Sequence, residues 1–167
     1  RPPPPFPPHP PVLSHSITRS TGLHAVLNAV AWLRSGMSEK FLAGASEAPL
    51  TPFTIAQMKA LKIYATEESE YPCKALDLEK KKNTMILGEG AGVLALEIHP
   101  KKEPLAYIVG VGFATEKLKH NISISEDAEC FQKSMKMALQ EAHLDAVDAI
   151  VMHAPGTIKG DLTELEA

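Results

Sequence analysis

Short apolar runs alternate along this chain with segments of helical period, and this alternation limits the possible folds more than any other feature. A helix is expected to begin after Ser20 and Thr21, which suit an N-cap, and to end near Gly36. Its apolar positions recur at steps of three and four: Leu23, Leu27, Val30 and Leu33. Further helices are expected over about 54–62 and 126–142, buried strands over 41–44 and 149–152, and strands over 85–87, 93–97 and 107–111. Apolar strands alternating with helices predict a largely buried α/β sheet.

Composition narrows the class of protein. The chain has 167 residues, 44% of them hydrophobic and 22% charged, which is usual for one globular domain. A net charge of −3 is too small to indicate nucleic-acid binding. The sequence has no apolar run near the roughly 20 residues of a membrane span, and it begins without a secretory-signal pattern. We therefore expect a cytoplasmic protein that binds neither nucleic acid nor membrane.

Cys73 and Cys130 are the two cysteines of the chain. Two thiols without a signal pattern are typical of a reducing compartment, so no disulfide framework is expected. Neither cysteine lies in a CxxC or histidine-rich cluster, and the sequence predicts no metal and no cofactor.

Eight prolines occur within residues 1–11. Proline fixes φ and lacks a backbone N–H, so this segment is expected to be extended and to join neither a sheet nor a helix interior. Residues 1–13 are interpreted as a proline-rich tail. Arg1, Pro4 and Pro7 also have a spacing that could dock on an aromatic groove, which leaves a peptide-ligand role open.

A lysine triplet and a glycine-rich stretch in the middle of the chain are interpreted as a loop and a turn. Lysines 80–82 follow a charged stretch and are expected to lie in a solvated loop. Glycines 88, 90 and 92 are expected to form a turn between two adjacent strands, 85–87 and 93–97. Their spacing matches neither phosphate-binding glycine motif, so nucleotide binding is not predicted.

Several longer motifs occur in a fixed order. Residues 44–47 read GASE and are followed by Thr51 and Pro52; residues 87–92 read LGEGAG; residues 153–157 read HAPGT and lead to Asp161 and Glu164. In this order and spacing, from Ser16 to Glu164, the chain resembles β-ketoacyl-acyl-carrier-protein synthases of the thiolase superfamily. The resemblance implies an α/β fold, the layered αβαβα arrangement of thiolases, represented by an incomplete portion. Residues 14–167 are interpreted as a partial ketosynthase domain.

The resemblance also shows which chemical groups differ. It implies a nucleophilic cysteine at the position of Arg19 and the first catalytic histidine at the position of Pro155. A guanidinium is not a nucleophile near neutral pH, and proline transfers no proton. Arg19 could bind an anion, or it could point to solvent. Ser20 is a conceivable substitute nucleophile, although N-capping is its commoner role.

The segment after Pro155 keeps other family positions. Gly156, Thr157, Asp161 and Glu164 match residues that the family uses to shape its active-site loop, which here is two residues shorter. His153 could replace the lost histidine, because alternate residues of a strand end share a face. An ordinary hydrogen-bonded histidine is the other interpretation.

Three functions follow from these observations. The first is a catalytically impaired subunit, similar to chain-length factors, that would pair with an active ketosynthase and bind an acyl carrier protein. The second is an active synthase, as a homodimer, whose nucleophile lies elsewhere, for example at Cys73. The third is an interaction module that recruits a partner through the proline tract.

Overall fold

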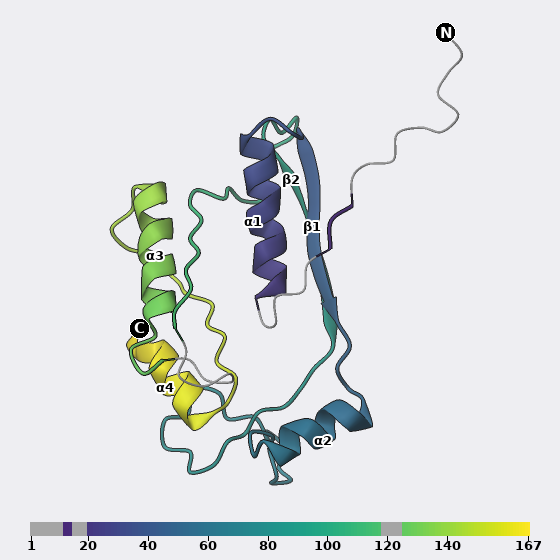
Figure 1. The fold of residues 1–167 in the computed structure, drawn as a ribbon, viewed down its shortest axis with the longest axis vertical. Coiled ribbons are helices and arrows are strands. Elements are labelled where there is room, and N and C mark those ends of the chain that lie inside the picture. Colours follow the sequence, from purple (N-terminus) through teal and green to yellow (C-terminus); the bar gives the residue numbers. More distant parts are fainter. Residues whose placement is uncertain (1–11, 15–19, 118–124) are drawn as a thin grey trace, which may run out of the picture. The chain divides into compact units, whose positions relative to one another are not determined.

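The computed structural model describes residues 12–14, 20–117 and 125–167 (Figure 1). In chain order these residues form the elements α1 (Thr21–Arg34), β1 (Lys40–Glu47), α2 (Pro52–Ala60), β2 (Gly90–Glu97), α3 (Glu129–Ala142) and α4 (Ile158–Glu166). The chain divides into two compact units, Arg1–Ser46 with Ala91–Lys101 and Glu47–Gly90 with Lys102–Ala167. No helix in the described ranges is long and apolar enough to cross a membrane.

In the first unit, α1 lies alongside a two-stranded sheet of β1 and β2 (Figure 1). Among the described residues of this unit, the buried apolar ones are Ala29, Val30, Leu33 and Ala43. The expected helix is confirmed, and Gly36 adopts a φ of 73° just after it, a conformation that favours glycine. Ser20 occupies the N-cap position, but its side chain makes no capping hydrogen bond.

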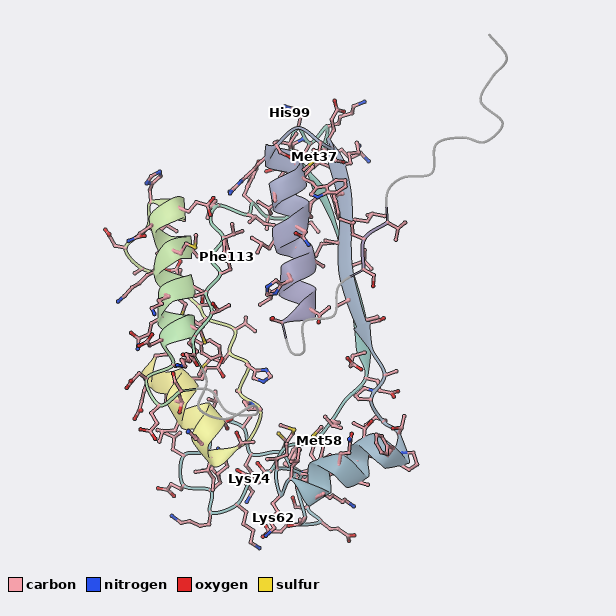
Figure 2. The ribbon with its side chains drawn as sticks, viewed as in Figure 1. Met37, Met58, Lys62, Lys74, His99 and Phe113 are labelled. Atoms are coloured by element: carbon pink, nitrogen blue, oxygen red, sulfur yellow. The ribbon has the colours of Figure 1, made fainter. Side chains whose placement is uncertain are left out.

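The two strands of the sheet run antiparallel. The backbone N–H of Ile98 donates to the carbonyl of Glu39, and Gly44 lies against Gly92 further along the pair. Lys40 and Glu97 form an ion pair of 2.9 Å beside this end of the sheet. Met37 and His99 lie at this same end of the unit (Figure 2).

The expected turn at the three glycines is wrong. Gly90 and Gly92 lie inside β2, and Gly88 precedes it; none of them has a positive φ. The run 85–87 instead meets Tyr64 through an isolated parallel bridge at Met85. Because β2 finds its partner in β1, the glycine-rich stretch continues a strand and does not reverse the chain.

Burial along β1 also differs from the expectation. The strand extends from Lys40 to Glu47, longer than the predicted run 41–44. Only Ala43 of the strand is buried, and Leu42 is 73% exposed. The position of the strand is therefore confirmed, and its buried character is wrong.

The runs 107–111 and 149–152 are not strands, contrary to the prediction. Apolar content alone makes no strand, because a strand requires a hydrogen-bonded neighbour. The N–H of Val111 donates instead to the carboxylate of Glu141 on α3, at 2.6 Å. Val151 is fully exposed.

The second unit contains α2, α3 and α4. Thr51 caps α2 by accepting a hydrogen bond from the N–H of Thr54, and Pro52 takes the first helical position, where proline is favoured. This helix begins two residues before the predicted range. The predicted helix over 126–142 is confirmed as α3 and begins at Glu129. The helix α4 was not predicted.

Glu116 holds the segment before α3 in place. Its carboxylate accepts hydrogen bonds from the N–H and hydroxyl of Ser125 and from the N–H of Cys130 in the first turn of α3. Burial alone would raise the pKa of Glu116, but the hydrogen bonds that Ser125 and Cys130 donate lower it below its ordinary value. The charged form is thus bound to a helix N-terminus, where a negative charge is stabilised.

Candidate active site

The candidate site is the loop of residues 153–157, which leads into α4. Two of its residues have a left-handed backbone, Ala154 with a φ of 37° and Gly156 with a φ of 77°. Glycine adopts this conformation freely, whereas alanine does so at a cost in energy. Such a backbone persists only where surrounding groups hold it, so the hydrogen bonds of the loop determine its shape.

Glu164, near the C-terminal end of α4, holds the first half of the loop. One carboxylate oxygen accepts from the N–H of His153 at 2.6 Å, and the other accepts from the N–H of Ala154 at 2.7 Å. The hydroxyl of Thr157 caps α4 by accepting from the N–H of Gly160 at 3.1 Å. The loop and the helix therefore form one hydrogen-bonded unit.

Asp161 lies in the first turn of α4, and its side chain is fully buried. Its Oδ1 accepts from the N–H of Gly156 at 2.9 Å. Its Oδ2 accepts from the N–H of Leu76 and from the Nζ of Lys80, both at 2.8 Å. Only 2% of the Lys80 side chain is exposed, so its assignment to a solvated loop is wrong; Lys81 and Lys82 are exposed, as predicted.

Residues of the segment 73–84 contact the loop and the start of α4. Thr84 donates to the carbonyl of Gly156 from its N–H at 2.8 Å and from its hydroxyl at 3.0 Å. The side-chain oxygen of Asn83 accepts from the N–H of Ile158 at 2.9 Å. A Cβ at Gly156 would lie 3.2 Å from the Thr84 carbonyl oxygen and 3.3 Å from the Sγ of Cys73. Glycine therefore suits this position for space as well as for φ.

The structure brings together six residues singled out from the sequence: His153, Pro155, Gly156, Thr157, Asp161 and Glu164. Arg19 lies outside the described residues. Ser20 belongs to the first unit, at the start of α1.

The contacts of Thr84 with this loop, and those of Lys80 and Asn83 with the start of α4, were not predicted. The charge of Asp161 was the one available signal, because a buried carboxylate requires a cation or several N–H donors. The sequence contains many lysines, and it does not indicate which of them would fill that role.

The backbone between His153 and Pro155 does not alternate as a strand does. The two residues would share a face on a strand, but this segment is not a strand and Ala154 has a left-handed conformation. His153 is exposed, and its N–H is bound to Glu164. Alternation along a strand therefore gives no reason to place the imidazole at the position of Pro155.

The loop offers little for acid–base or nucleophilic chemistry. The N–H groups of His153, Ala154, Gly156 and Ile158 donate to the side chains of Glu164, Asp161 and Asn83, and Pro155 has no N–H.

Outside the loop, on α3, Cys130 is also a poor nucleophile. Burial, and then the neighbouring Glu116, raise the pKa of its thiol, which disfavours the thiolate. Within the described ranges, no three His, Cys, Asp or Glu side chains gather to hold a metal ion.

Comparison with known proteins defines the class. The chain matches the model of the β-ketoacyl synthase N-terminal domain over residues 10–102 and that of the C-terminal domain over residues 105–167. This class has the thiolase-like α/β fold that the resemblance implied, and the predicted fold class is confirmed. The chain belongs to the β-ketoacyl synthase family.

Three similar proteins illustrate the relationship. The 3-oxoacyl-[acyl-carrier-protein] synthase 2 of Rhizobium meliloti is 31% identical over 92% of this chain and 38% of its own length. A structure of a type II polyketide acyl-carrier protein in complex with its ketosynthase, bound to the hexaketide, is 26% identical; the match has a TM-score of 0.74 and covers 88% of this chain and 38% of that one. A ketosynthase in complex with its chain length factor, from Xenorhabdus doucetiae, shares the fold at 21% identity and a TM-score of 0.73, over 88% of this chain and 35% of that one. This chain thus spans less than two fifths of the length of each relative.

Proposed function

We propose that this chain belongs to a ketosynthase-like subunit of fatty-acid or polyketide biosynthesis that does not itself catalyse condensation. The observation that carries the proposal is the loop around Pro155. Condensation requires a thiolate that accepts an acyl group, and histidine N–H groups that stabilise the negative charge formed on decarboxylation. At Pro155 the proton-transferring side chain is absent, and four neighbouring backbone N–H groups already have acceptors within the protein.

Arg19 supports the same conclusion from the sequence alone. If the family pattern holds at this position, a guanidinium replaces the nucleophilic thiol. Two separate substitutions, one at each of two catalytic positions, are expected of a subunit released from selection for catalysis. The loop itself is nevertheless well held, which is expected of a subunit whose fold still serves an assembly.

The proposed role is that of a chain-length factor. Such a subunit would pair with an active synthase, help to shape the tunnel for the acyl chain, and contribute to the surface that receives an acyl carrier protein. We propose a cytoplasmic location, a tail over residues 1–13 and a partial ketosynthase domain over 14–167.

One observation favours a second function, an active synthase that uses a different nucleophile. Cys73 is exposed, and its Sγ lies beside Gly156 of the candidate loop. No helix begins at Cys73, so this thiol lacks the helix N-terminus that often activates a nucleophilic cysteine. An acyl group on Cys73 separates this function from the first one.

Native mass spectrometry of the protein purified from its own source tests the proposed assembly. We expect a heterodimer in which the second chain is a synthase with an intact nucleophilic cysteine. Mild acidification should separate the two chains and give the mass of each. A homodimer with no second synthase would contradict the role of a chain-length factor.

A further inference from the structure

We infer that Lys80 is a positioning residue, which holds the 153–157 loop in its observed conformation by way of Asp161. The inference deepens the proposed function, and its relevance to a ketosynthase site rests on that proposal. The contacts that carry it do not depend on whether the loop is catalytic.

The environment of Lys80 is unusual for a lysine. Its side chain is 2% exposed, and its Nζ donates to the Oδ2 of Asp161 at 2.8 Å and to the carbonyl of Asp77 at 2.9 Å. Moving an ammonium group out of water is costly unless it is paired and hydrogen-bonded. A buried lysine is therefore retained where its charge has a definite partner, and here that partner is a carboxylate that also binds the loop.

Asp161 connects Lys80 to the loop through one rigid group. Its carboxylate binds Gly156 with one oxygen and binds Leu76 and Lys80 with the other. If Lys80 were replaced by an uncharged residue, the buried carboxylate of Asp161 would keep only two backbone donors. The negative charge of Asp161 would then be largely uncompensated. The carboxylate would then be driven to rotate toward water, and this rotation weakens its bond to Gly156.

Gly156 is the loop residue that depends directly on the carboxylate of Asp161. Its N–H binds Asp161, its carbonyl accepts from Thr84, and its φ of 77° is fixed between these contacts. Pro155 directly precedes it, so the position of the family's histidine is set by the same contacts. Lys80 thus determines the geometry at Pro155 without touching it.

Lys82 provides a matched control two residues away. It forms an ion pair of 3.0 Å with Glu67, but 67% of the lysine side chain and 66% of the glutamate side chain are exposed. The two lysines share residue type, segment and kind of partner. They differ in burial and in whether the partner binds the loop.

Amide hydrogen exchange of the full chain tests the inference with Lys80→Met and Lys82→Met. Methionine keeps much of the length of lysine without its charge. In Lys80→Met we expect the amides of His153, Ala154 and Gly156 to exchange about tenfold faster or more, relative to those of α3 in the same unit, because a buried charge loses its partner. In Lys82→Met we expect no change in this ratio. Equal acceleration in the loop and in α3, or the same loop effect from Lys82→Met, would overturn the inference.

A second variant covers the case in which Lys80→Met does not fold. Combining Lys80→Met with Asp161→Leu removes both buried charges, a change that proteins tolerate better than the loss of one partner. We expect this double variant to fold and to exchange its loop amides faster than the parent, because Gly156 has lost its acceptor. Parental exchange in the loop would overturn the inference. An acyl adduct on the protein would contradict the proposed function and leave this result unaffected.

Discussion

Replacing Asp161 with alanine is expected to lower the free energy of unfolding by about 3–5 kcal/mol, because one partner of a buried ion pair is lost. The variant leaves the ammonium of Lys80 buried without its carboxylate. It also removes the acceptor of the Gly156 and Leu76 N–H groups. Each buried donor left without an acceptor adds to the cost of the charge.

Urea unfolding followed by far-ultraviolet circular dichroism measures this loss, with Glu67→Ala as the control. The control also breaks a lysine–carboxylate pair, with Lys82, but that pair is exposed. Its expected cost is about 0–1 kcal/mol. Similar losses for the two variants would contradict the structural role that we assign to Asp161.

Replacing Gly112 with alanine is expected to lower the stability of the second unit by about 1–3 kcal/mol, the usual cost of overpacking. A Cβ at Gly112 would collide with the backbone carbonyl of Ser134 on α3 and would lie 2.9 Å from the backbone N of Ala138. A flexible side chain can move away from such a contact, whereas a helix backbone cannot do so without shifting the whole element. In the Gly112→Ala variant, the segment around residue 112 must therefore move away from α3.

Gly88→Ala is the control for this variant, because a Cβ at Gly88 would meet nothing within 4 Å. Both substitutions add one methyl group, so their difference isolates the packing against α3. Thermal unfolding measures both, and the melting temperature should fall for Gly112→Ala and stay near the parental value for Gly88→Ala. Equal melting temperatures would show that residues near Gly112 do not pack on α3 as described.

The helices α1, α2 and α3 could be predicted from the sequence because their signals are local. The steps between Leu23, Leu27, Val30 and Leu33 specify one face of α1 without reference to any other segment. The strands were predicted less accurately than the helices. An apolar run such as 149–152 is compatible with a strand, but whether it becomes one depends on a distant neighbour that the run does not specify.

The candidate site could be predicted only in part, for a similar reason. Residues 153–164 are close in sequence, and a motif resemblance found them together. Lys80 is separated from Asp161 by eighty residues of chain, and a lysine between Glu79 and the exposed Lys81 has no local sign of burial. The helix α4 was missed because its signal is short, a threonine cap at Thr157 followed by nine residues.

Intact-mass spectrometry after incubation with an acyl-carrier-protein thioester tests the central claim most directly. The full chain is incubated without a partner synthase, beside an active ketosynthase as a positive control, and then digested to locate any adduct. We expect the control to gain one acyl group and this chain to keep its unmodified mass. An acyl group on Cys73, or on any other residue of this chain, would contradict the claim that the subunit is not catalytic.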